Sequence, residues 1–200
     1  MKPAWRTAAC LATLLLAACG PQEPIRIGFI GVGLRGQNHV EMALMRDDCE
    51  IAALADPDPR MMADTLKMIE EKGRKKPDVY ANGPHDYQRL LADKNIDAVV
   101  IASPWEWHTA QCVAAMQAGK YVGTEVGGGF SLDECWQLVN THEATGSQLM
   151  FMENVCYRRD VMAVLQMVFN LHTCRHADIG SSGIALQVRQ DPGGGWRAPA

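Results

Sequence analysis

The chain has 200 residues, 48% of them hydrophobic and 21% charged, and a formal net charge of -4 at pH 7. These values exclude an intrinsically disordered chain, and the slight excess of acidic residues disfavours binding to the phosphate backbone of nucleic acids. No apolar run reaches the roughly 18 to 20 residues of a membrane-spanning helix, and the length suits one domain of ordinary size.

Residues 1–18 have the pattern of a secretory signal peptide. Lys2 and Arg6 supply positive charge before an apolar stretch that ends in small residues, followed by Cys19. This ending resembles a bacterial lipobox, in which the cysteine receives lipid and becomes the new N-terminus. We therefore expect an exported protein on the periplasmic side of the membrane, anchored by lipid at Cys19, with residues 19–24 as a tether. An ordinary signal peptide cleaved nearby is the alternative.

The seven cysteines do not have the pattern of a disulfide framework. Cleavage would remove Cys10 and lipidation would use Cys19, which leaves five, an odd number without regular spacing. Cys112, Cys135 and Cys156 lie in apolar contexts, and we expect them to be small buried hydrophobic residues.

From residue 25 onward, short apolar runs alternate with amphipathic stretches. The apolar runs predict strands over residues 25–30, 50–56, 79–81, 98–102, 121–126 and 149–153. The amphipathic stretches predict helices over residues 37–45, 59–72, 85–92, 108–118 and 131–145, the last of which opens with a capping box formed by Ser131 and Glu134. Strands that alternate with helices in this way predict an α/β fold, in which helices cover both faces of a parallel sheet.

The first strand runs directly into the glycine motif Gly31-Val-Gly33-Leu-Arg-Gly36. Between a strand and a helix, G-x-G-x-x-G is typical of a dinucleotide-binding loop. Gly31 permits the tight turn, Gly33 lets the backbone approach a pyrophosphate, and Gly36 lets the helix pack close to the sheet. The start of the helix then presents unpaired N–H groups to the phosphates. A purely structural turn is the alternative.

Asp56 lies at the end of the second strand, 20 residues after Gly36. A carboxylate there can accept hydrogen bonds from the ribose hydroxyls and repel a 2′-phosphate, so the sequence favours NAD over NADP. Arg35 argues the other way, because an arginine near this position can bind a 2′-phosphate. Asp56 could instead serve as a turn residue within residues 56–59.

Polar and aromatic side chains also follow three later strands. They occupy residues 103–108 after the fourth strand, 124–126 after the fifth and 153–160 after the sixth. Because ligands bind at the carboxyl ends of parallel strands, we expect these segments to converge on one crevice. For residues 103–108, a helix start with aromatic packing is the alternative.

Four segments together resemble glycoside hydrolase family 109, which belongs to the Gfo/Idh/MocA group of NAD-dependent proteins. They are Gly31 to Gly36, Ser103 to His108, Asp133 to Gln137 and Met152 to Asp160, and the resemblance covers about residues 25–168. It implies a Rossmann-type, doubly wound parallel sheet and an α-N-acetylgalactosaminidase, a hydrolase of glycans with terminal N-acetylgalactosamine. In such an enzyme bound NAD transiently oxidises C3 of the sugar, the glycosidic group leaves by elimination, water adds at C1, and C3 is reduced again.

The resemblance also implies roles for individual residues. The NAD-binding residues would be Gly31, Gly33, Leu34, Arg35, Gly36, Asp56, Pro104, Trp105, Glu106, Trp107, His108, Glu125, Val126 and Asn154. Tyr157 and His108 are the candidate catalytic residues for proton transfer, although a packing role is the alternative for Tyr157. No metal site is expected, since His172, Cys174, His176 and Asp178 have alternating spacing but no evident partners.

The sequence departs from the family pattern in two places. The wider group often has Glu-Lys-Pro after the fifth strand, whereas this chain has Glu125-Val126-Gly127 and two further glycines, which we expect to loosen that loop. Residues 169–200 do not resemble the family, whose members continue into a second, open-sheet domain. We therefore expect that domain to be truncated here and the last 32 residues to be an out-of-frame tail.

Three functions stay open at this point. The first is the family's NAD-dependent glycosidase, present as a fragment that lacks one wall of its sugar site. The second is an NAD-dependent sugar dehydrogenase of the same wider group. The third is an inactive, lipid-anchored remnant that still binds NAD.

Overall fold

The computed structural model describes residues 23–178, with side chains described as far as residue 169. The chain divides into two compact units, Met1–Glu153 and Asn154–Ala200. The predicted signal peptide and Cys19 lie outside the described residues, as does most of the expected out-of-frame tail, and these stay predictions. In the part that the structure describes, no helix is both long and apolar enough to cross a bilayer.

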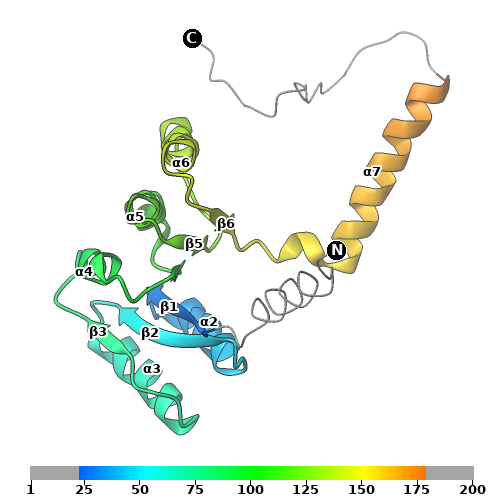
Figure 1. Cartoon of the computed structure of the whole chain (residues 1–200). Helices are drawn as coiled ribbons and strands as arrows, with labels where there is room; N and C mark the ends of the chain where they lie inside the picture. Colours follow the sequence, from blue (N-terminus) through cyan, green and yellow to red (C-terminus); the bar gives the residue numbers. More distant parts are fainter. Residues whose placement is uncertain (1–22, 179–200) are drawn as a thin grey trace, which may run out of the picture. The chain divides into compact units, whose positions relative to one another are not determined.

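The first unit is a six-stranded parallel sheet with helices between its strands (Figure 1). The strands are β1 (Ile25–Ile30), β2 (Cys49–Ala55), β3 (Asp78–Tyr80), β4 (Ala98–Ile101), β5 (Tyr121–Thr124) and β6 (Leu149–Phe151). The helices are α2 (Leu34–Leu44), α3 (Pro59–Glu71), α4 (Tyr87–Ala92), α5 (Trp105–Gln117) and α6 (Leu132–Thr145). The predicted Rossmann-type, doubly wound α/β fold is confirmed.

The strand order β3-β2-β1-β4-β5-β6 has one reversal, between β1 and β4. From β1 the chain first winds outward to β2 and β3, and then returns to place β4 on the other side of β1. All five neighbouring pairs are parallel, so every strand ends at the same edge of the sheet. A crevice opens at such a switch point because the loops after the two central strands leave in opposite directions.

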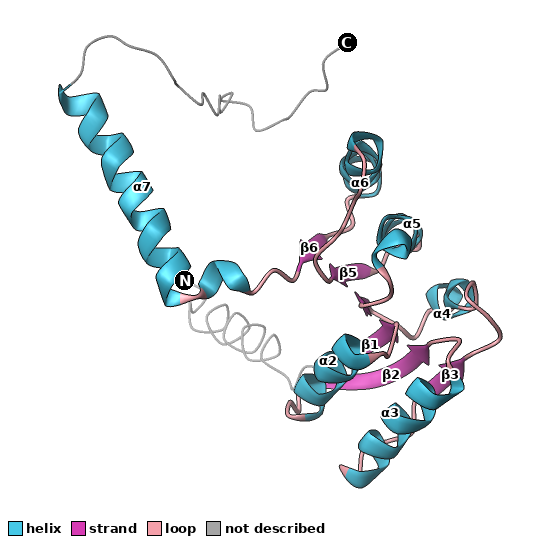
Figure 2. Cartoon of the chain, turned by 180° about the vertical axis from the view of Figure 1, so that it is seen from behind, coloured by secondary structure: helices cyan, strands magenta, loops and turns pink. Residues whose placement is uncertain are grey.

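Two hydrophobic clusters fill the two faces of this sheet. Helices α2 and α3 cover one face, where Val40 and Ile69 pack with Phe29 and Leu54 of the strands. Helices α4, α5 and α6 cover the other face and enclose a separate cluster (Figure 2). Burial on both faces explains why the strands read as continuous apolar runs rather than as alternating ones.

The structure corrects several predicted boundaries. Helix α2 begins at Leu34, three residues before the predicted start, and α5 begins at Trp105 rather than at His108. Pro104 supplies the extended residue that precedes α5, so the helical turn starts directly behind it. Strand β5 ends at Thr124, which leaves Glu125 and Val126 in the loop after it.

The capping box predicted at the start of α6 is confirmed. Ser131 Oγ accepts a hydrogen bond from the Glu134 N–H at 3.1 Å, and the Glu134 side chain accepts one from the Ser131 N–H at 3.0 Å.

Of the three cysteines predicted to be buried, only Cys112 is fully buried. This burial raises the pKa of its thiol to about 11. Cys135 is exposed because it lies on the outer side of α6, and Cys156 is half-buried.

The second unit begins with a short 3-10 helix, η1 (Val155–Tyr157), followed by α7 (Arg159–Asp178). Asn154 precedes the 3-10 helix, and a two-pronged ion pair joins the Arg158 guanidinium to Asp160 at the start of α7. This segment therefore carries Asn154 and Tyr157 on a compact turn.

Candidate functional site

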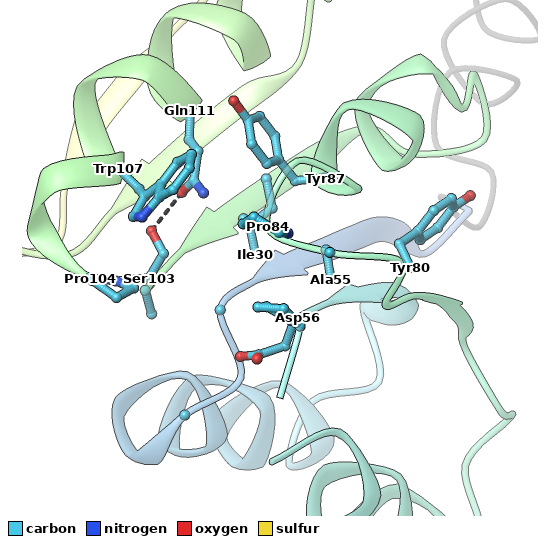
Figure 3. A pocket seen from close by; sticks show the side chains of 15 residues that line it. Ile30, Ala55, Asp56, Tyr80, Pro84, Tyr87, Ser103, Pro104, Trp107 and Gln111 are labelled. Atoms are coloured by element: carbon cyan, nitrogen blue, oxygen red, sulfur yellow. Dashed lines mark hydrogen bonds between the residues drawn. The ribbon is translucent and has the colours of Figure 1, made fainter. Parts of the chain in front are cut away.

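A pocket of about 380 Å³ opens at the carboxyl edge of the sheet, at the switch point between β1 and β4. Its floor is formed by the ends of three strands and the loops that follow them, and Figure 3 shows Asp56, Trp107 and Tyr87 facing it from different sides. The lining residues are Ile30, Gly31, Gly33, Ala55, Asp56, Pro57, Tyr80, Gly83, Pro84, Tyr87, Ala102, Ser103, Pro104, Trp107 and Gln111. The pocket thus combines one carboxylate with an aromatic wall.

The three glycines of the motif meet different constraints. A Cβ on Gly31, whose φ is +85°, would lie 2.5 Å from the backbone nitrogen of Ser103, and one on Gly36 would lie 2.0 Å from the carbonyl oxygen of Gly31. A Cβ on Gly33 would meet nothing within 4 Å. Packing therefore requires the first and third glycines, whereas the second leaves open space next to the backbone at the start of α2.

The start of α2 is free to accept an anion. Gly33 is its N-cap residue and offers no side chain, and no acidic residue lies in its first turn. In the described part of the structure, the N–H groups there have no side-chain cap, and the helix dipole adds partial positive charge. This arrangement fits a pyrophosphate group, and the space at Gly33 is where its oxygens would approach.

Asp56 is held in place by two backbone amides. Its Oδ2 accepts a hydrogen bond from the Val32 N–H and its Oδ1 accepts one from the Asp58 N–H, both at 2.8 Å. The second bond makes Asp56 a turn residue, so the two expected roles are compatible. Each carboxylate oxygen keeps a second lone pair, which fits hydrogen bonding to ribose hydroxyls beside the glycine loop.

Residues 104–108 do not all face the pocket. Pro104 and Trp107 line it, and the Trp107 ring packs edge-on against His85 at 5.2 Å between ring centroids. Trp105 and Glu106 are exposed on the first turn of α5. Because α5 begins at Trp105, these side chains point in successive directions around a helix instead of together into a crevice.

The structure places His108 outside the lining of this pocket, and its predicted role as a catalytic and cofactor-contacting residue stays a prediction. Its side chain is 0% exposed, and its Nε2–H donates to the carbonyl oxygen of Ser103 at 2.8 Å. Ser103 Oγ in turn donates to Gln111 Oε1 at 2.6 Å. His108 therefore holds the turn between β4 and α5, which packs directly against Gly31.

Glu125 forms a buried ionic cluster with the first turns of α2. Its Oε1 accepts hydrogen bonds from Arg35 Nε at 2.7 Å and from His39 Nε2 at 2.6 Å, and its side chain is only 8% exposed. Burial alone would raise the pKa of the Glu125 carboxyl, but the bonds from His39 and Arg35 outweigh that effect and hold its pKa below the ordinary value. The carboxylate is therefore charged at neutral pH.

The glycine loop after Glu125 is packed tightly, contrary to the expectation that three glycines would loosen it. A Cβ on Gly127 would lie 2.8 Å from the Trp105 ring, and one on Gly128 would lie 2.0 Å from the Phe151 ring. The Gly128 carbonyl also accepts a hydrogen bond from Thr109 Oγ1 at 2.8 Å. Glycine is needed here because aromatic rings press against the backbone.

Asn154 and Tyr157 belong to the second unit, so their predicted contacts with cofactor and substrate stay predictions. The Tyr157 side chain is 72% exposed. Within the described part of the chain, no three metal-ligating side chains gather at one point. The side chains of His172, Cys174, His176 and Asp178 lie outside it.

Sequence reasoning missed His39 and the aromatic wall formed by Tyr80 and Tyr87. His39 follows Arg35 by four residues, which places the two on one face of α2, and this spacing was the available signal. Nothing local indicated that Glu125, 86 residues further along the chain, would complete the cluster.

Comparisons with known proteins agree with this fold. The model of the Gfo/Idh/MocA oxidoreductase family, described as an NAD-binding Rossmann fold, matches residues 25–153. The chain is 48% identical over 145 residues to an alpha-N-acetylgalactosaminidase of Tannerella forsythia, an alignment that covers 72% of this chain and 31% of that protein. It is 43% identical over 171 residues to a glycosyl hydrolase family 109 protein of Stenotrophomonas maltophilia, covering 81% and 37%. The chain thus spans about a third of the length of these curated relatives.

Solved structures share the fold. Apo scyllo-inositol dehydrogenase from Lactobacillus casei superposes with a TM-score of 0.62 at 21% identity, over 74% of this chain and 42% of that one. Myo-inositol 2-dehydrogenase from Lactobacillus plantarum gives a TM-score of 0.62 at 22% identity, with the same coverage.

The glycine geometry predicts opposite outcomes for two alanine variants. Gly36→Ala should lower the free energy of unfolding by about 1 to 3 kcal/mol, because its Cβ would overlap the Gly31 carbonyl. Gly33→Ala should change it by less than about 0.5 kcal/mol, because the added methyl group meets open space. Urea unfolding of both variants measures the contrast, and equal destabilisation would contradict it.

The Glu125 cluster predicts a pH-dependent contribution to stability. Glu125→Gln should lower the free energy of unfolding at pH 7 by about 1 to 3 kcal/mol, because Gln cannot supply the negative charge that pairs with Arg35 and that accepts the hydrogen bond from His39. The folded-state pKa of Glu125 lies below its unfolded value, so this stabilisation is complete above about pH 5 and is lost as the pH falls through the folded-state pKa. Urea unfolding at pH 7 and near pH 3 measures the difference in the free energy of unfolding between the unmutated chain and Glu125→Gln. This difference should be smaller near pH 3, and a difference that does not change with pH would refute the assignment.

Proposed function

The chain belongs to the Gfo/Idh/MocA oxidoreductase family, and from that premise we propose that it provides the NAD-binding part of a glycosidase that removes terminal α-N-acetylgalactosamine. The observation that carries the proposal is the open, uncapped start of α2 beside Asp56, in a chain 48% identical to an alpha-N-acetylgalactosaminidase over this region. The whole protein's activity is part of the proposal, because the alignment covers about a third of that relative.

Different residues of the pocket bind different parts of the cofactor. The backbone N–H groups of Gly33, Leu34 and Arg35 bind the pyrophosphate, and the Asp56 carboxylate binds the adenosine ribose. The aromatic side of the pocket, with Trp107, suits the adenine ring because a flat apolar base gains most from stacking and burial there.

The segment that starts at Glu125 and Val126 supports the nicotinamide end. Arg35 contributes its backbone to the phosphate site, while its Nε is bonded to Glu125. That ion pair favours NAD over NADP, because a 2′-phosphate at Asp56 would have to compete with Glu125 for the guanidinium.

Bound NAD supplies a reversible oxidation at C3 of the sugar, which acidifies the C2 proton and allows the glycosidic group to leave. The protein must orient the sugar, remove the C2 proton and exclude premature exchange with water. Tyr157 is the residue we assign to proton transfer, with Asn154 as a cofactor contact from the same turn. His108 is not assigned a proton-transfer role, since its imidazole is buried and committed to Ser103.

Cofactor preference tests the role of Asp56. The chain should bind NAD more tightly than NADP, and Asp56→Ala should weaken NAD by about tenfold and reduce the preference, because a hydrogen-bonding charge is lost beside the ribose. Titration calorimetry with both dinucleotides measures this. Asp58→Ala is the matched control: it removes the cap of α3 two residues away and should leave the preference unchanged. Tighter binding of NADP by the unmutated chain would overturn the assignment.

Activity in heavy water tests the glycosidase itself. The glycosidase to which this chain contributes the NAD-binding part should release N-acetylgalactosamine from an α-linked substrate with deuterium at C2 and without net formation of NADH, since oxidation and reduction cancel within each turnover. NMR of the released sugar and absorbance at 340 nm provide the two readouts. Accumulation of NADH without release would indicate a sugar dehydrogenase instead. Deuterium at C2 would support elimination, and the absence of any turnover by the whole enzyme would contradict the proposed activity.

A further inference from the structure

The cluster of Arg35, His39 and Glu125 joins two parts of the site that are far apart in the sequence. Arg35 and His39 lie one turn apart on α2, the helix whose start faces the pyrophosphate position. Glu125 lies 90 and 86 residues further along the chain, directly after β5. Between β1 and β5 stands β4, so the cluster bridges over one strand at the carboxyl edge of the sheet.

Both oxygens of Glu125 are engaged. Oε1 receives the bonds from Arg35 and His39, and Oε2 accepts one from the Val126 N–H at 3.3 Å. The His39 ring is largely buried, with its side chain 15% exposed, whereas Arg35 is about half exposed at 48%. His39 is therefore the partner that the protein interior holds in one orientation.

The segment that Glu125 begins is fixed from its other side as well. Gly127 packs on the Trp105 ring, and the Gly128 carbonyl accepts a hydrogen bond from Thr109 on α5. The contacts from α5 fix its far end, and those from α2 fix its near end. We place Glu125 and Val126 beneath the nicotinamide. The contacts from α2 therefore determine where the backbone that would support this ring lies relative to the start of α2.

We propose that His39 is a positioning residue which, through Glu125, holds residues 125–129 in register with α2 and so aligns the nicotinamide half of NAD with its pyrophosphate half. This inference rests on the proposed binding of NAD. It makes a specific demand: loss of His39 disturbs the nicotinamide end of the site and leaves the adenosine end, built from Gly33, Asp56 and Trp107, as it was.

Paired titrations with NAD and ADP-ribose test this, because ADP-ribose has the adenosine and pyrophosphate groups but no nicotinamide ring. His39→Leu should weaken NAD by about tenfold while the dissociation constant for ADP-ribose changes by less than about twofold. His39→Gln, which restores an N–H donor of similar reach, should recover most of the NAD affinity. Asn38→Ala changes the exposed residue directly before His39 on α2. It is the matched control and should leave the dissociation constants for NAD and ADP-ribose unchanged.

The outcomes separate the inference from the proposed function. A merely structural role for His39 would weaken both ligands together, and this result, or unchanged NAD binding in His39→Leu, would overturn the inference. Thermal melting of each variant with ADP-ribose bound checks that the fold is retained. If the unmutated chain binds neither ligand, the NAD site itself is wrong and the inference falls with it. If it binds ADP-ribose and NAD equally well, the adenosine site stands and only the nicotinamide alignment fails.

Discussion

The close packing of the backbone at Gly31 and Gly36 governs how the site is built. With no Cβ at either position, the start of α2 packs onto the turn after β1, and that turn packs onto the backbone of Ser103 after β4. The approach brings the uncapped N–H groups of α2, the Asp56 carboxylate and the loop after β4 to one pocket. A side chain at either glycine would push these three parts away from one another, so the geometry of the ligand site and the packing of the sheet depend on the same two contacts.

The ionisation of Glu125 at this edge of the sheet depends on both burial and hydrogen bonding. A carboxyl group as buried as that of Glu125 would be driven towards its neutral form, yet its two partners from α2 keep it ionised. Such a cluster adds little to stability compared with a well-packed apolar one, but it fixes orientation, because losing either partner leaves a buried charge uncompensated. His108 has a comparable role on the other side of the sheet edge, since one of its ring nitrogens bonds the Ser103 carbonyl and fixes that turn from inside the domain. Glu125 and His108, which both lie outside the pocket, thus fix the loops that follow β5 and β4.

The sequence was sufficient to predict the order of strands and helices, the parallel sheet, the packing roles of Gly31 and Gly36 and the Ser131 capping box, because each depends on local chemistry or on a pattern with a fixed period. It was insufficient where packing decided. Trp105 and Glu106 read as a polar loop, but Pro104 allows a helix to start directly after it, and this rotated His108 into the core. Cys135 was expected to be buried, yet it lies exposed on α6. The His39–Glu125 contact joins residues 86 positions apart, which no local pattern encodes.

The central claim is that the start of α2 binds the pyrophosphate of NAD while the segment after β5 receives the nicotinamide. Backbone amide NMR of the labelled chain, recorded during a titration with NAD, tests it most directly. We predict that the largest shift changes fall on the amides of residues 33–36 and, together with them, on the amides of residues 125–129. Shift changes that spare residues 33–36, or that cluster at the opposite edge of the sheet near the ends of α2 and α3, would contradict it.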